Sequence, residues 1–171
     1  LDLHVDAKGR VESGNVIAEI PGKSDEIVLI GAHLDSWDLG TGAVDDGAGI
    51  GITVGAAKLI LDLNKVPKRT IRVVMFGSEE VGLVGARAYV AKHKDVLINH
   101  MVGAESDFGA GKIWRFETNF APEKLYLADA IHKILEPLGI GRGHNNASGG
   151  PDIGPMTVSY THLTLPTNAC V

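Results

Sequence analysis

Three short segments of the chain carry side chains that can bind a metal ion or move a proton, namely His33 with Asp35, Glu79 with Glu80, and Glu105 with Asp107. Imidazole and carboxylate groups without a thiolate suit zinc, and they also suit manganese or cobalt. The adjacent pair of glutamates is informative, because one carboxylate can bind a metal while its neighbour acts as a general base toward the reacting water. These residue types therefore indicate metal-dependent hydrolysis.

Each of these segments follows a run of apolar residues that is typical of a buried strand. The runs cover residues 27–32, 70–76 and 100–104, and continuous apolar runs of this length fit strands that are covered on both faces. Because ligands bind at the carboxyl ends of strands in an α/β sheet, we expect the polar side chains to lie together at that edge. Several carboxylates held close together resist joint ionisation, and a divalent cation removes this conflict.

Helical segments alternate with the strands along the chain. We expect two further strands, at Val16–Ile20 and at residues 113–117. We expect three helices, at residues 50–63, 82–93 and 122–138. This alternation predicts a three-layer α/β/α sandwich with a central mixed, mainly parallel sheet. The apolar faces of the first and third helices are expected to belong to the core. Residues 36–49 are rich in glycine and aspartate, and they predict a loop.

The bulk composition limits the class of protein. A chain of 171 residues is long enough for one domain with a real core, and its 44% hydrophobic and 22% charged residues are ordinary for a globular protein. The net charge of -5, without a basic cluster, argues against a nucleic-acid partner. No apolar run approaches the ~20 residues of a membrane helix. The single cysteine, Cys170, leaves no disulfide framework within the chain.

Several of these motifs, taken in order, resemble those of a known family. The stretches GAHLDSWDLGTGAVDDGAG (residues 31–49), SEEVGLVGA (78–86) and ESD (105–107) are similar to the co-catalytic zinc aminopeptidase superfamily, and most of all to its carboxypeptidase Q group. The resemblance covers residues 15–152. It implies the zinc-exopeptidase fold and hydrolysis of the terminal peptide bond of dipeptides or short peptides, with two zinc ions and a bridging hydroxide.

Carried over residue by residue, the resemblance implies a role for each motif residue. His33 and Asp107 would bind the first zinc ion, and Asp45 would bridge both ions. Glu80 would bind the second zinc ion. Glu79 would be the general base that takes a proton from the water and passes it to the leaving amine. Glu79 and Glu80 could in principle exchange their roles.

Neighbouring residues receive supporting roles. By the same resemblance, Asp35 would be a carboxylate that orients the His33 imidazole, a common partner of metal-binding histidines. The bond between Asp45 and Asp46 matches the position of a non-proline cis peptide in the family. Glu105 could be an additional ligand, but we expect it to be buried or to support the site.

One metal ligand that the resemblance implies has no counterpart. The family supplies a final histidine to the second zinc ion from a histidine-rich loop well after the position of Asp152. Here residues 158–171 read VSYTHLTLPTNACV, and His162 has neither the context nor the spacing of a metal-binding histidine. We therefore interpret residues 1–157 as an incomplete, C-terminally truncated catalytic domain and residues 158–171 as a non-native tail.

Two further side chains are candidates for substrate contacts. His144 lies in the loop GHNNASGGPD, at a position where relatives have a histidine-containing substrate loop, and Trp37 is a candidate for a pocket wall. A plain loop histidine and a packing tryptophan are the alternatives. The glycines of residues 40–51 satisfy no nucleotide-binding motif, and we expect them to let the backbone pass close to the metal site.

Other functions remain open on the sequence alone. A catalytically inactive relative that uses the fold for binding, as transferrin receptor and nicastrin do, is disfavoured because all but one of the expected site residues are present. A related amidohydrolase or cyclase would differ in its substrates. The expected partner is a short peptide, with no nucleic acid and no membrane segment, and a homodimer is a further expectation. The family implies a secreted or periplasmic location, although the chain carries no signal segment.

Overall fold

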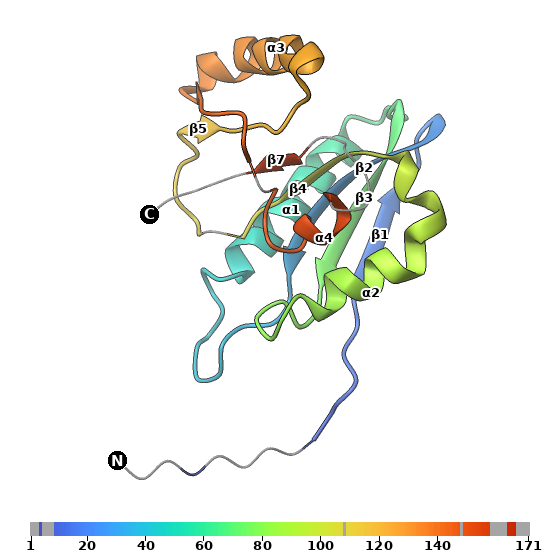
Figure 1. Cartoon of the computed structure of the whole chain (residues 1–171), viewed down its shortest axis with the longest axis vertical. Helices are drawn as coiled ribbons and strands as arrows, with labels where there is room; N and C mark the ends of the chain where they lie inside the picture. The colour runs from blue at the N-terminus through green and yellow to red at the C-terminus, as the bar shows by residue number, and fades with distance from the viewer. Residues whose placement is uncertain (1–3, 5–8, 108, 148, 158–163, 167–171) are drawn as a thin grey trace.

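Strands from distant parts of the sequence form a mixed sheet at the centre of the computed structural model, which describes residues 4, 9–107, 109–147, 149–157 and 164–166 (Figure 1). In spatial order the strands are β1 (Val16–Ile20), β3 (Arg69–Phe76), β2 (Ser24–His33), β4 (His100–Glu105) and β7 (Thr164–Pro166). All neighbouring pairs are parallel except β1 with β3. The predicted mixed, mainly parallel sheet is therefore confirmed.

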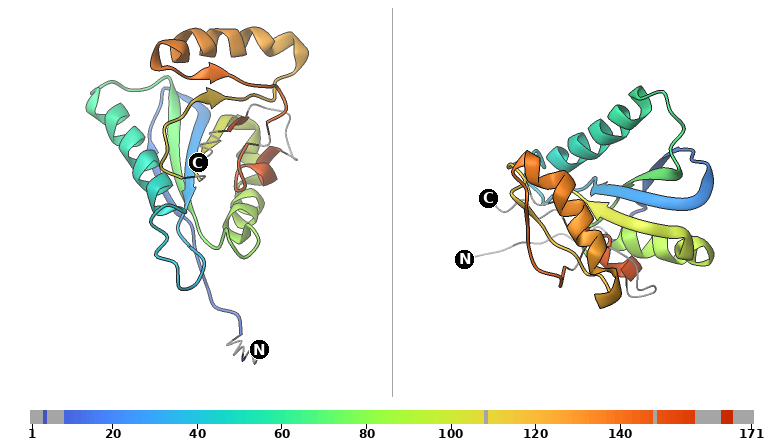
Figure 2. Two further views of the ribbon diagram at one scale, coloured as in Figure 1. Left: turned by 90° about the vertical axis from the view of Figure 1, so that its left-hand side faces the viewer. Right: turned by 90° about the horizontal axis from the view of Figure 1, so that it is seen from above.

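Helices cover both faces of this sheet, as the two views in Figure 2 show. On one face lies α1 (Gly47–Asp62), and on the other lie α2 (Val84–His93) and the short α4 (Gly154–Thr157). A smaller unit beyond the sheet consists of α3 (Leu125–Leu135) and a parallel two-stranded sheet of β5 (Arg115–Phe116) and β6 (Gly141–Arg142). Within the described ranges, no helix has the length and apolar character needed to cross a bilayer.

Three short 3-10 segments join these elements, at η1 (Lys94–Asn99), η2 (Pro122–Lys124) and η3 (Glu136–Leu138). The predicted helix over residues 122–138 is thus an α-helix with a 3-10 turn at each end, and each turn has a proline among its first two residues. The predicted strand over residues 113–117 shortens to β5. The predicted loop GHNNASGGPD (residues 143–152) lies between β6 and α4.

The core lies on both sides of the central strands, because successive side chains of a strand point to opposite faces. On the α2 side, Leu29, Val74 and Phe76 are completely buried and pack with Tyr89 of the helix. On the α1 side, the buried cluster is smaller and is built on Ala32, Val73 and Met75. The two layers hold the carboxyl ends of β2 and β3 in place.

The expectation that the apolar faces of the first and third predicted helices belong to the core is wrong in part. The fully buried residues of α1 are Gly49 and Thr53, whereas Leu59 and Leu61 are 70% and 55% exposed. In α3 only Ala128 is fully buried. A helix in one layer contacts the sheet through one stripe, so the apolar side chains of α1 outside that stripe are exposed.

Gly49 lies where α1 begins against the end of β4. A Cβ atom on Gly49 would lie 1.9 Å from the carbonyl oxygen of Ser106 and 2.0 Å from Oδ1 of Asp46. We expect Gly49→Ala to lower the free energy of unfolding by about 2 to 3 kcal/mol, because the backbone must shift. Denaturant unfolding measures this effect.

Gly51, in the same helix, provides the matched control. A Cβ atom there would meet nothing within 4 Å. Gly51→Ala should therefore raise the free energy of unfolding by about 0.5 to 1 kcal/mol through helix propensity alone. Equal destabilisation by the two substitutions would contradict the close contact of Gly49.

Candidate metal centre

His33 stands at the end of β2 and is almost completely buried. Its Nε2 atom lies 3.0 Å from Oδ1 of Asp45 and 3.1 Å from Oδ1 of Asp107. Asp45 comes from the loop before α1, and Asp107 follows β4. Ligand atoms of these three residues all lie within 4.8 Å of one another, so together they could hold a metal ion.

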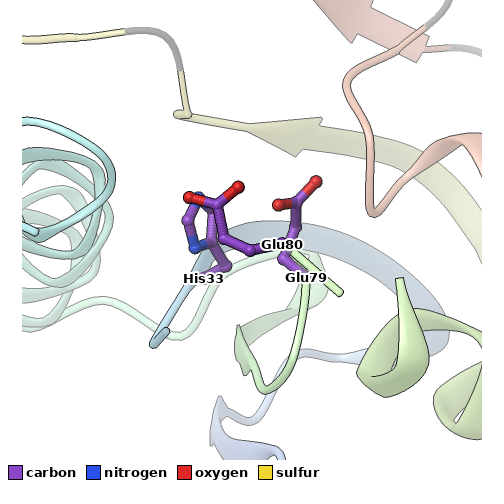
Figure 3. A group of neighbouring side chains, drawn as sticks. All are labelled: His33, Glu79 and Glu80. Carbon is purple, nitrogen blue, oxygen red and sulfur yellow. The ribbon is translucent and has the colours of Figure 1, made fainter. Parts of the chain in front are cut away.

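A second group of ligand atoms shares the same histidine. Glu79 and Glu80 follow β3, and each offers a carboxylate oxygen that lies within 4.8 Å of His33 and of the other glutamate. Figure 3 shows the three side chains projecting to the same side of the chain segments that carry them. The strand ends therefore bring the predicted metal and base residues together.

Asp35 links the segment after β2 to the segment after β3. Its carboxylate accepts hydrogen bonds from the backbone N–H groups of Glu79 (2.8 Å) and Glu80 (3.1 Å). The His33 ring is instead held by the backbone carbonyl oxygen of Asp35, 2.8 Å from Nδ1, whereas the carboxylate is 3.8 Å away. Asp35 thus contacts both segments, through its carbonyl oxygen toward the imidazole and through its carboxylate toward the glutamate pair. That its carboxylate orients the His33 imidazole stays a prediction.

Asp46 connects the metal cluster to the start of α1, which begins three residues earlier than the sequence predicted. The bond between Asp45 and Asp46 is cis, as expected. The buried Asp46 carboxylate accepts hydrogen bonds from the N–H groups of His33 (2.9 Å) and Gly49 (3.0 Å). Sequence reasoning gave the Asp46 side chain no role, although an aspartate before an apolar helical stretch is a typical N-cap.

The cluster carries more negative charge than its own imidazole can balance. Burial alone would lower the pKa of His33, but the Asp107 hydrogen bond and the charges of Asp46 and Asp107 raise it to about 10. Burial and neighbouring carboxylates raise the pKa of Glu79 to about 7, and burial with Asp45 raises that of Glu80. A group of this kind favours a bound proton or a cation.

Within the described residues, Oε1 of Glu80 is buried and has no hydrogen-bond partner. A buried carboxylate oxygen without a partner is unfavourable, and a cation would satisfy it. The donor set, one imidazole with several carboxylates, is also one that zinc accepts. The residues present therefore fit a divalent metal.

Zinc binding to the metal-free chain should release protons. With a pKa of about 10, His33 is protonated near neutral pH, and a histidine must lose this proton to become a ligand. The apparent zinc affinity should therefore fall as the pH drops from about 8 to about 6. Calorimetry in buffers of different ionisation enthalpy measures the released protons, and a binding enthalpy that did not depend on the buffer would contradict the prediction.

Glu105 and Asp152 form a buried acidic pair behind the cluster. Glu105 is buried, as expected, and its Oε2 atom accepts a hydrogen bond from the backbone N–H of Asp152 (2.9 Å). Burial, and then the Asp152 carboxylate, raise the pKa of Glu105 to about 9. Sequence reasoning gave Asp152 no role, because a single aspartate in a loop of glycine and proline carries no signal of burial.

The two candidate substrate residues lie in different places. Nε2 of His144 is 3.1 Å from Oε1 of the buried Glu117, and neither group of ligand atoms found among the described residues includes His144. Trp37 lines a hollow together with Asp45 and Glu80. Contact with substrate stays a prediction for both residues. His162 lies outside the described residues.

Comparisons with known proteins agree with this geometry. Residues 15–118 match the model of peptidase family M28. Over 140 residues the chain is 38% identical to carboxypeptidase Q of Xenopus laevis. The matched region covers 81% of this chain and 30% of the relative. The chain therefore spans 30% of the length of this relative.

Solved structures show the same fold. A peptidase M28 precursor from Shewanella amazonensis SB2B superposes with a TM-score of 0.85 at 50% identity, over 90% of this chain and 35% of that one. A zinc aminopeptidase from Bacillus subtilis superposes with a TM-score of 0.67 at 25% identity, over 89% of this chain and 39% of that one. The central sheet with its covering helices is thus shared with these proteins.

Proposed function

The chain belongs to peptidase family M28, and from this premise we propose that it forms the metal-binding part of a zinc-dependent exopeptidase. The proposed reaction is hydrolysis of the terminal peptide bond of dipeptides or short peptides. The observation that carries the proposal is that one buried histidine, His33, is shared by two groups of potential ligand atoms. Similarity to carboxypeptidase Q and to a zinc aminopeptidase supports it.

Four residues are proposed to hold two zinc ions. We assign His33 and Asp107 to the first ion, Asp45 to a position between the two ions, and Glu80 to the second ion. Their support is the close grouping of the ligand atoms and the buried, unsatisfied Oε1 of Glu80 among the described residues. When bound, zinc would polarise the scissile carbonyl and lower the pKa of a water molecule.

Glu79 is proposed to move the proton. Its side chain belongs to the same group of atoms as Glu80, and its backbone is held by the Asp35 carboxylate. A carboxylate at this position can accept a proton from the attacking water and then return it. We propose that Glu79 passes this proton to the nitrogen of the leaving amine.

Zinc titration of this chain tests the proposed metal site. We expect one zinc ion to bind tightly and a second to bind weakly, because the last histidine ligand of the family has no counterpart in residues 1–157. Isothermal titration calorimetry resolves the two steps. Two equally tight sites would contradict an incomplete second site, and no binding at all would contradict the proposed function.

Hydrolysis of a dipeptide panel by the zinc-loaded chain provides the second readout. Zinc binding without hydrolysis of any peptide or amide would favour an inactive binding relative. Hydrolysis of non-peptide amides alone would favour a related amidohydrolase. The homodimer and the secreted or periplasmic location stay predictions.

A further inference from the structure

A hollow of about 300 Å³ opens beside the candidate metal centre. We call it the loop pocket, and its walls are Ser36, Trp37, residues 40–45 and Glu80. Asp45 and Glu80 belong both to this wall and to the two groups of potential metal ligands. A molecule that occupies the loop pocket therefore lies next to the metal-binding residues.

The lining of the loop pocket also includes apolar, accessible side chains. Trp37 is 65% exposed and Val44 is 54% exposed, so both side chains keep apolar surface that a ligand can cover. Among the described residues that line the hollow, none is basic. The lining of the loop pocket thus combines aromatic and aliphatic side chains with two carboxylates.

Glycine keeps the loop backbone close to this wall. Gly42 has a positive φ of 62°, and a Cβ atom there would lie 2.8 Å from the Cβ of Ser36. A larger residue would push the two sides of the loop apart. The same turn carries the backbone N–H of Gly47, which donates a hydrogen bond to the carbonyl oxygen of Gly42 (2.7 Å). The loop therefore has a defined path from Trp37 to Asp45.

We propose that the loop pocket receives an apolar side chain of the substrate residue next to the scissile bond, with Trp37 as its specificity-determining contact. This proposal rests on the proposed function. An apolar side chain gains free energy when it covers the exposed surface of Trp37 and Val44. A carboxylate side chain would lose its hydration there without gaining a basic partner.

Amino-acid hydroxamates test the proposal without relying on turnover, because the hydroxamate group binds metal while the side chain is varied. The zinc-loaded chain is titrated by calorimetry with leucine, glycine and aspartate hydroxamates. We expect leucine hydroxamate to bind roughly tenfold more tightly than glycine hydroxamate, and aspartate hydroxamate to bind more weakly than leucine hydroxamate. Trp37→Ala should remove most of the difference between leucine and glycine, and Trp37→Phe should restore part of it.

Leu39 provides the matched control in the same loop. Leu39 is fully exposed and does not line the hollow, so Leu39→Ala should keep the preference for leucine hydroxamate. The chain has two tryptophans, Trp37 and Trp114. In a Trp114→Phe background, the remaining Trp37 fluorescence should change on addition of leucine hydroxamate.

The outcomes separate this proposal from the function on which it rests. Equal affinities for leucine and glycine hydroxamates, unchanged in Trp37→Ala, would overturn the loop pocket and leave the zinc site standing. A leucine preference that survives Trp37→Ala would place the side-chain contact elsewhere and would also overturn it. If no hydroxamate bound the zinc-loaded chain, the proposed function and the loop pocket would both fail.

Discussion

Replacing His33 by alanine should weaken zinc binding on the order of a thousandfold and abolish peptide hydrolysis. Loss of a partner that merely supports a metal ligand typically lowers metal affinity by about 10- to 100-fold, so loss of the ligand itself should exceed that. His33 is the one residue common to both groups of ligand atoms found among the described residues. Its removal also leaves Asp45 and Asp107 without the imidazole that both contact.

His132 supplies the control for this substitution. It lies on α3, where its ring packs near Phe116, and it belongs to neither group of ligand atoms. His132→Ala should therefore keep the zinc affinity of the unmodified chain in the same calorimetric titration. If His33→Ala bound zinc within about tenfold of the unmodified chain, His33 would not be a ligand and the assignment of the metal centre would be wrong.

The main features of the site could be predicted because buried parallel strands are easy to recognise. The predicted apolar runs correspond to β2, β3 and β4. β2 ends at His33, β3 ends shortly before Glu79, and β4 ends shortly before Asp107. Since parallel strands place their carboxyl ends at one edge, their order alone brings these residues together. The predicted bounds at Val16–Ile20 also agree with β1.

Contacts that depend on a choice between chemically similar groups could not be predicted. Asp35 offers both a carboxylate and a carbonyl oxygen, and only the folded loop determines that the carbonyl faces His33 while the carboxylate faces Glu79 and Glu80. The burial of Asp152 follows in the same way from the position of its loop against Glu105. The local sequence does not indicate which of these groups will contact each other in the folded protein.

The outer surface of α1 illustrates a second limit. Apart from Lys58 and Asp62 its residues are almost all apolar or small, so the pattern does not say clearly which stripe packs on the sheet. The structure places Thr53 against the sheet, where its hydroxyl donates a hydrogen bond to the carbonyl oxygen of Gly31 (3.1 Å), and leaves Leu59 exposed. The two-residue strand β6 was similarly beyond prediction, because it is too short to show any period, and β5 was predicted longer than it is.

Glu79→Gln should lower kcat roughly a thousandfold, a typical loss when a general base is removed. Glutamine has almost the same shape as glutamate, and the backbone N–H of residue 79 can still donate its hydrogen bond to Asp35. Tight zinc binding should therefore persist, which separates a missing base from a damaged metal site. Steady-state kinetics on a dipeptide and calorimetry with zinc measure the two effects.

The same variant should change the pH dependence of stability in the metal-free chain. Burial raises the pKa of Glu79 from its ordinary value to about 7, so the folded state holds this proton more tightly than the unfolded state. The contribution of Glu79 to stability is therefore present at low pH and is lost as the pH rises toward 7. Glu79→Gln should remove that loss of stability. If the free energy of unfolding depended on pH in the same way in the variant and in the unmodified chain, the prediction would be contradicted.

Glu80→Gln decides whether the two glutamates have been assigned in the correct order. If Glu80 binds the second zinc ion, its loss should weaken the second step of the zinc titration, whereas Glu79→Gln should leave both steps unchanged. The reverse pattern would exchange the two roles, because both carboxylates lie in one group of ligand atoms. A third outcome is that Glu79→Gln keeps full turnover and that neither variant binds zinc more weakly. This outcome would exclude both glutamates from the reaction and leave the metal site to His33, Asp45 and Asp107.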